Sequence, residues 1–218
     1  MCLSVLGACG EAPLPSPPGE KSEPLCEVPL SDLPFATHVV DFTPGVNAGF
    51  GDAEFPEVVL GPPAGGGTAN GALNVLSLGV GGEITLGFGD RLISNGDGPD
   101  FVVFENPFAI GGDRTNPFAE LAQISVSNDG ETWRSFDCDS SSDYPWTDCA
   151  GWRLVDTFSG CSPAIYANDT GGDLFDLATL GMEEARFIKI VDLSSSGGAP
   201  SAGFDLDAIG VFHFTHAP

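Results

Sequence analysis

The order of apolar and polar residues along the chain predicts short β-strands. From residue 37 onward, apolar or alternating runs are separated by Gly, Pro, Asn and Asp. Such runs are typical of strands joined by tight turns. The pattern predicts strands over residues 38–42, 72–78, 83–88, 101–104, 122–127, 133–136, 185–192 and 204–214. Residues 61–71, 94–100 and 194–203 are predicted turns, and residues 173–180 a short helical turn.

Composition supports the same fold class. The 218 residues include 30 Gly, 18 Pro and 16 Phe, and only 17% are charged. This balance favours many short strands over long helices, and the length suits one core. We therefore predict an all-β chain whose antiparallel β-sandwich spans residues 35–218, after a short leader at residues 1–9 and a Pro-rich linker at residues 10–34.

The first residues carry a targeting motif. The apolar start ends in Leu6-Gly7-Ala8-Cys9, which resembles the lipobox of bacterial lipoproteins. The resemblance implies a lipid on Cys9, a place in the bacterial cell envelope or on the extracellular surface, and membrane attachment only through that lipid. The stretch 11–25, rich in Pro, Glu and Ser, would then be a stiff spacer. A departure from the motif is that no Lys or Arg precedes the apolar run. The alternative is a chance match in a tail.

Three segments of the second half carry a fold resemblance. Residues 124–133 read as a strand, an Asp129-Gly130 turn and a second strand that starts at Trp133. They resemble a hairpin of discoidin-like domains, and residues 185–190 and 203–212 are similar to the strands that follow in those domains, in the same order. The resemblance implies a galactose-binding-like jelly roll. Segments upstream resemble uncharacterised bacterial cell-surface proteins, which imply no activity.

The charge excludes one class of partner. Against 31 Asp and Glu stand 7 Lys and Arg, a formal net charge of -24. Such a surface repels the phosphate backbone of nucleic acids and anionic membranes, so nucleic acid is excluded as a partner. The acids either form a solvated surface or line pockets that collect divalent cations.

Two acids near the end of the chain predict a cation site. By strand alternation Asp205 and Asp207 share a face with Ile209 and Val211, and the opposite face is also apolar. Buried carboxylates need hydrogen bonds or a cation to offset their desolvation. Calcium suits them, because it takes oxygen ligands. Carbohydrate-binding modules with a similar jelly roll hold a calcium between the first and last strands, and this resemblance implies that Asp41 joins the two acids.

Two further acidic groups are weaker candidates. Asp97 and Asp100 lie in a Gly-rich loop, and Glu105 alternates inward at the end of the next strand, where it needs a partner. Asp173 and Asp176 form the other group. Each group can equally be a capped turn or a solvated loop.

The cysteines predict disulfides. The chain has six cysteines and no Cys-x-x-Cys pair, which favours structural bridges and export over zinc or redox chemistry. Cys138 and Cys149 flank a polar loop and form the first predicted bridge, and Cys26 and Cys161 form the second. Four cysteines permit three pairings, so the connectivity stays open.

The same loop holds the candidate ligand-binding residues, Tyr144, Trp146 and Trp152. Aromatic rings on a braced loop can stack on a sugar, or they can simply cap the sandwich. None of the nucleophile, zinc or phosphate-loop motifs is present, so no enzyme is predicted. The sequence favours a surface module that recognises a glycan or another protein. The alternatives are a structural or adhesive surface protein and a secreted glycoside hydrolase or its accessory module.

Overall fold

The computed structural model describes residues 29–64, 69, 71–155 and 171–216. Within these residues every strand pairing is antiparallel. Helical structure there is limited to 3-10 turns, namely η1 (Leu30–Asp32), η2 (Asp52–Glu54), η3 (Glu57–Val59), η4 (Ile110–Gly112) and η5 (Leu177–Leu180). The chain is all-β, as the sequence predicts.

The main sheet is built around a central strand with clear alternation. Its order is β1 (His38–Thr43), β3 (Glu83–Gly87), β13 (Phe187–Asp192), β8 (Ala122–Ser127) and β10 (Cys149–Ala150), with β9 (Arg134–Ser135) also paired to β8. In β13, Ile188 and Ile190 are buried, while Phe187 and Lys189, which alternate with them, are half-exposed. This is the alternation that places one face of a strand in a core.

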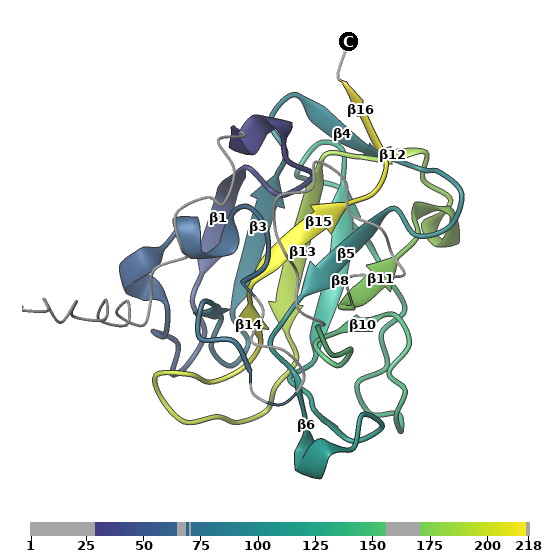
Figure 1. The fold of residues 1–218 in the computed structure, drawn as a ribbon. Helices are drawn as coiled ribbons and strands as arrows, with labels where there is room; N and C mark the ends of the chain where they lie inside the picture. Colours follow the sequence, from purple (N-terminus) through teal and green to yellow (C-terminus); the bar gives the residue numbers. More distant parts are fainter. Residues whose placement is uncertain (1–28, 65–68, 70, 156–170, 217–218) are drawn as a thin grey trace, which may run out of the picture.

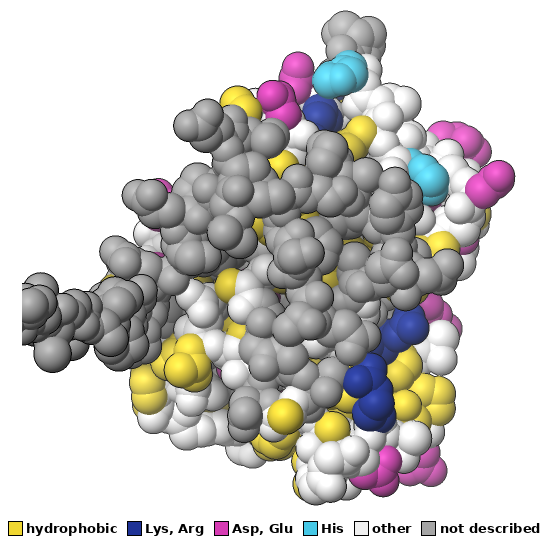
Figure 2. Space-filling model, in the orientation of Figure 1, with side chains coloured by type: hydrophobic (Ala, Val, Ile, Leu, Met, Phe, Trp, Pro, Cys, Tyr) yellow, Lys and Arg dark blue, Asp and Glu magenta, His cyan; other side chains and the backbone are white. Residues whose placement is uncertain are grey.

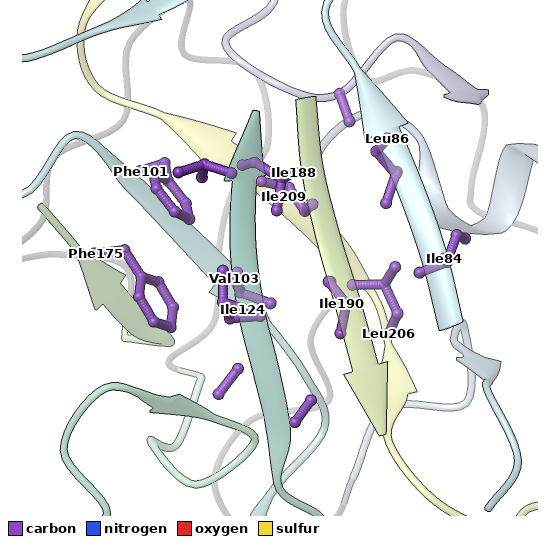
Figure 3. Packing of buried hydrophobic residues seen from close by; sticks show 14 of the residues in the cluster. Ile84, Leu86, Phe101, Val103, Ile124, Phe175, Ile188, Ile190, Leu206 and Ile209 are labelled. Carbon is purple, nitrogen blue, oxygen red and sulfur yellow. The ribbon is translucent and has the colours of Figure 1, made fainter. Parts of the chain in front are cut away.

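Shorter antiparallel sheets form the opposing layer (Figure 1). They are β11 (Asp173–Phe175), β5 (Phe101–Phe104) and β15 (Ala208–Val211); β12 (Glu184–Ala185), β4 (Arg91–Ser94) and β16 (Phe214–His216); and β14 (Asp205–Leu206) with β2 (Leu76–Ser77). Figure 3 shows Ile84, Ile188 and Ile190 of the main sheet packed with Val103 and Ile209 of this layer. The molecule is therefore a β-sandwich.

The N-terminal segment of the described chain covers the outer face of β5. Alternate β5 side chains belong to the main core and to a second, smaller cluster. Leu33 and Phe35 complete the second cluster, and the backbone N–H of Val211 donates to the carbonyl of Pro34 at 2.8 Å. Leu33, near the end of the predicted linker, therefore fills part of a core.

Several short strands were missed or predicted with the wrong bounds. The strand predicted over residues 72–78 is limited to β2, and the one over residues 204–214 is divided into β14, β15 and β16. The predicted helical turn over residues 173–180 is β11 followed by η5. The sequence predicted neither β4, nor β10, nor the hairpin of β6 (Phe108–Ala109) and β7 (Pro117–Phe118). The strands β6, β7 and β10 have two residues each, which leaves no alternation to detect.

The closing strand changes face at Asp207. Uninterrupted alternation would place Leu206 and Ala208 on one face. Instead Leu206 lies in the main core together with Ile209, and Ala208 lies in the second cluster. Asp207 stands between β14 and β15, and its backbone N–H donates to the carbonyl of Phe104 at 3.0 Å. The interruption shifts the side-chain period by one residue, which corrects the predicted faces.

Candidate functional site

Three carboxylates that are far apart in the sequence meet beside β14. Glu105 follows β5, Glu120 precedes β8, and Asp205 begins β14. One oxygen of each carboxylate lies within 4.8 Å of one oxygen of the other two. Glu105 and Asp205 are buried and Glu120 is half-buried. Among the described residues, no other group of three or more His, Cys, Asp and Glu side chains brings its ligand atoms this close.

Glu105 is the least satisfied member of this acidic cluster. Its side chain is 3% exposed, and its Oε2 atom has no hydrogen-bond partner. Asp205 is better supplied, since the hydroxyl of Ser77 donates to its Oδ1 and Asn106 Nδ2 donates to its Oδ2 at 3.4 Å. Burial raises the pKa of Glu105 well above its usual range, and the charges of Asp205 and Glu120 raise it further. The predicted inward Glu therefore lacks the partner that it needs.

The other two carboxyl groups are also held in a less ionised state. Burial, aided by the charge of Asp205, raises the pKa of Glu120 to about 7. Burial raises the pKa of Asp205 to about 6. In the described part of the chain, no Lys or Arg forms an ion pair with any member of the acidic cluster. Among the described residues, three acidic groups thus lie together without an ion pair to a Lys or Arg.

A hard divalent cation fits this donor set. All three groups offer oxygen, and the cluster contains neither His nor Cys, so zinc and softer metals fit less well. Calcium takes six to eight oxygen ligands, and a carboxylate can supply one or two of them. Glu105, Glu120 and Asp205 can therefore provide much of a calcium coordination sphere, with water or carbonyl oxygens for the rest.

The calcium site predicted between the first and last strands does not form. Asp207 is fully buried, and both of its oxygens accept a hydrogen bond from the backbone N–H of Ala64, at 3.1 and 2.9 Å. Asp41 is exposed on the edge strand β1 and does not join Asp205. The pairing of Asp41 with the two closing-strand acids is therefore wrong, and Asp205 alone of the three belongs to the acidic cluster.

The predicted loop site also divides. Asp97 is exposed. Asp100 is buried and accepts hydrogen bonds from the backbone N–H groups of Gly96 at 2.7 Å and Leu177 at 2.8 Å, so it joins two turns. Glu105 lies at the other end of β5, five residues along the chain, or about 16 Å at the rise of a strand. The three residues therefore share no ion.

The third predicted group bonds to backbone instead. Asp173 is buried and accepts hydrogen bonds from the backbone N–H groups of residues 151–153, the shortest at 2.7 Å from Gly151. Burial raises its pKa to about 7. Asp176 caps η5 by accepting from the N–H of Ala178 at 2.8 Å. Both acids hold turns in place, which is the alternative that the sequence left open.

No family model and no curated protein matches this chain.

The disulfide-braced loop gathers the three predicted aromatic residues. Cys138 and Cys149 form a disulfide with an S–S distance of 2.04 Å. The ring centroid of Tyr144 lies 5.7 Å from that of Trp146 and 5.5 Å from that of Trp152, both edge-on. Tyr144 is 41% exposed and the two Trp rings are half-buried. The predicted residues thus form one partly exposed cluster, which we call the aromatic loop.

Hydrogen bonds fix the orientation of both indoles. Trp146 Nε1 donates to the carbonyl of Ser142 at 2.8 Å, and Trp152 Nε1 donates to the carbonyl of Cys149 at 3.1 Å. Each ring is therefore tied to the backbone of its own loop. A fixed, partly exposed ring loses little conformational entropy when a ligand stacks on it.

Sequence reasoning missed Glu120. It is a single Glu between β7 and β8 with no motif around it. Its one signal is position, because it precedes a predicted strand just as Glu105 follows one. Glu105 and Glu120 meet Asp205 through tertiary contacts, and the spacing of the three residues in the sequence does not indicate this.

A groove of about 210 Å³ lies elsewhere, at the N-terminal segment. Arg91 and Phe88 line it with Leu30 and Thr37. Arg91 is committed to the fold, since its Nη1 donates to the carbonyl of Leu33 at 2.8 Å. The groove is smaller than most ligand pockets, so no ligand is assigned to it.

Several predictions concern residues beyond the described ranges. Cys9, Cys26 and Cys161 all lie there, so the lipid and the second disulfide stay predictions. No helix in the described residues has the length and apolar character needed to cross a membrane.

Proposed function

We propose that this protein is a non-catalytic recognition module of the bacterial cell envelope or extracellular surface, which binds calcium through Glu105, Glu120 and Asp205. One observation carries the proposal: Glu105 Oε2 is buried without a partner where two more carboxylates lie within 4.8 Å. An unpaired buried charge is costly, and a divalent cation would offset that cost for all three groups at once. The ligand of the module is a glycan or another surface protein.

Calorimetry and thermal unfolding test the calcium site. Calcium chloride added to chelator-treated protein is expected to bind in an equimolar ratio and to raise the melting temperature, because the ion binds the folded state only. Glu105→Gln is expected to abolish this response. The variant is also expected to be at least as stable as wild type in chelator, because it removes a charge from a repulsive group.

The control variant is Asp41→Asn. Asp41 is an exposed acid outside the acidic cluster, so its calcium response is expected to equal that of wild type. A wild-type protein that releases no heat with calcium and melts at the same temperature in chelator would overturn the calcium site.

Recognition is proposed to use the aromatic loop. Partly exposed rings with fixed orientations are suited to stacking on the apolar face of a sugar. A glycan array probed in calcium is expected to show binding that Trp146→Ala removes. Trp133→Ala is the matched control, because Trp133 is outside the aromatic loop as defined and packs against Lys189 on β13. Equal array profiles for wild type and Trp146→Ala would instead favour a structural or adhesive protein.

A glycoside hydrolase fits the acidic cluster less well. Such an enzyme needs two carboxyl groups that reach the glycosidic bond. Glu105 is 3% exposed and Asp205 is buried, so a sugar cannot contact both. A metal ion is much smaller than a sugar, so it can reach carboxylates that a sugar cannot. The burial of Glu105 and Asp205 therefore favours ion binding over hydrolysis.

Surface display is proposed to depend on Cys9, because of its lipobox-like context. When the chain is expressed in a bacterium with its native leader, metabolic labelling with an alkyne fatty acid is expected to mark wild type and Cys2→Ser. Cys9→Ser is expected to stay unlabelled. Label that persists in Cys9→Ser would contradict the anchor.

A further inference from the structure

The acidic cluster stands at the base of a hairpin. Glu105 follows β5, Glu120 precedes β8, and the hairpin of β6 and β7 occupies residues 106–119 between them. Both ends of the hairpin therefore terminate in a carboxylate of the cluster. The third carboxylate, Asp205, belongs to β14 in the opposing layer. An ion held by all three would fix both hairpin ends against that layer.

Strand pairing does little to hold this hairpin in place, and at its first residue Asn106 Nδ2 donates to the carbonyl of Ala72 at 3.0 Å. Its strands make two ladder pairs, Phe108 with Phe118 and Ala109 with Pro117, and among the described strands they pair with no other. The two Phe rings stack at 5.1 Å, but Phe118 is still 45% exposed. Isolated two-stranded hairpins are marginally stable in water. The position of this hairpin therefore depends on how its two ends are held.

Glu120 also contacts the base of the aromatic loop. Its backbone N–H donates to the carbonyl of Gly151 at 3.2 Å. Gly151 has φ +95°, and a Cβ atom there would overlap the Glu120 carbonyl oxygen, so the close approach requires glycine. The N–H groups of Gly151 and Trp152 both donate to Asp173 Oδ2, at 2.7 and 3.3 Å. A displacement of Glu120 thus reaches Trp152 through one backbone hydrogen bond and one peptide unit.

The charges near this junction set the direction of the effect. Without a cation, each carboxyl group of the cluster that ionises repels the other two, and the charge of Asp173 adds to the repulsion on Glu105. Glu120 is the half-buried member between two loops, so it has the most freedom to move away. A cation converts this repulsion into attraction and draws Glu120 back toward Glu105 and Asp205.

We infer that calcium at the acidic cluster orders the 106–119 hairpin and the aromatic loop together, so that ligand binding by the loop depends on calcium. The inference rests on the proposed function, since it joins the calcium site to the recognition surface. It assigns Glu120 as a positioning residue that acts on Trp152 through Gly151.

Tryptophan fluorescence tests the coupling, because the chain has three Trp and two of them lie in the aromatic loop. Trp133→Phe leaves Trp146 and Trp152 as reporters. Titration of this variant with calcium chloride is expected to shift its emission, with the same midpoint and equimolar end point as calorimetry gives. The reverse variant, Trp146→Phe with Trp152→Phe, leaves only Trp133 and is expected to show no shift.

Hydrogen exchange on the wild-type chain provides a second readout. Calcium is expected to slow exchange in residues 106–119 and 138–152, and to leave the central strand β13 unchanged. If calcium binds by calorimetry while the loop fluorescence and both segments stay unchanged, the coupling is wrong and the calcium site stands. If calcium does not bind at all, both the proposed calcium site and the coupling are wrong.

Discussion

Hydrogen-bond donors decide what each buried acid does in this protein. Asp192 accepts from the backbone N–H groups of Gly81 at 2.9 Å, Ser194 at 3.0 Å and Phe204 at 2.8 Å, and from the Ser194 hydroxyl at 2.8 Å. Glu105 has an oxygen with no donor at all. The first is a structural acid that joins three turns, and the second is the acid that we propose as a cation ligand.

Asp192→Ala is expected to lower the free energy of unfolding by about 3–5 kcal/mol, because it leaves buried backbone donors unsatisfied. Urea denaturation measures the change. The exposed Asp41→Ala is expected to stay within about 0.5 kcal/mol of wild type. A cost for Asp192→Ala no larger than that of Asp41→Ala would contradict the role assigned to Asp192.

At the scale of elements, short segments are held in place by contacts with other parts of the chain. The N-terminal segment has only the turn η1, yet Phe35 is fully buried against the outer face of β5. The aromatic loop has little regular structure and relies on a disulfide. Removing the buried Phe35 ring or the disulfide is therefore expected to lower the free energy of unfolding.

Phe35→Ala is expected to lower the free energy of unfolding by about 3–5 kcal/mol, the range for deleting a buried aromatic ring. Val40→Ala on the edge strand β1 is the control, because Val40 is largely exposed. Chemical denaturation of the two variants checks the difference. Equal stability would mean that the N-terminal segment does not belong to the domain.

The double variant Cys138→Ser with Cys149→Ser is expected to lose about 3 kcal/mol, from the entropy of a loop whose cysteines are 11 residues apart. Thermal unfolding with and without a reducing agent measures the effect. Reducing agent should lower the melting temperature of wild type toward that of the variant. A wild-type melting temperature that reduction leaves unchanged would show that this bridge adds no stability.

At the scale of the whole molecule, negative charge is the dominant property. The formal charge is -24, and acidic side chains are visible at the top, the right and the bottom of the face in Figure 2. Several acids are buried in the interior as well. The stability of the whole domain should therefore respond to both pH and cations.

In chelator, the melting temperature is expected to fall as pH rises from about 5 to about 8. The pKa is about 7 for Asp173 and Glu120 and about 6 for Asp205, all above the values of an unfolded chain. The folded state therefore binds more protons, and the stability that this gives is lost as these groups ionise. Saturating calcium is expected to reduce the fall, because it compensates the cluster. A melting temperature in chelator that rises over this interval would contradict the assignment.

Local pattern determined the fold class and some positions. Alternation in residues 185–192 predicted the buried Ile188 and Ile190, and the polar stretch between Cys138 and Cys149 predicted the braced loop. Burial of Glu105 followed from the same strand alternation. These features depend on neighbours within a few residues, which is the range that sequence patterns describe.

Tertiary structure alone decided which acids meet. Asp205 and Asp207 are two residues apart, yet Asp205 joins the acidic cluster from β14, whereas Asp207 lies at the interruption between β14 and β15 and bonds to Ala64. Glu120 carries no motif, and only the packing of β5, β8 and β14 brings it to Glu105. The sequence determines which chemical groups the side chains carry. Which groups become the neighbours of a buried carboxylate depends on strand register and on the paths of loops, and both are set by the packing of the whole core.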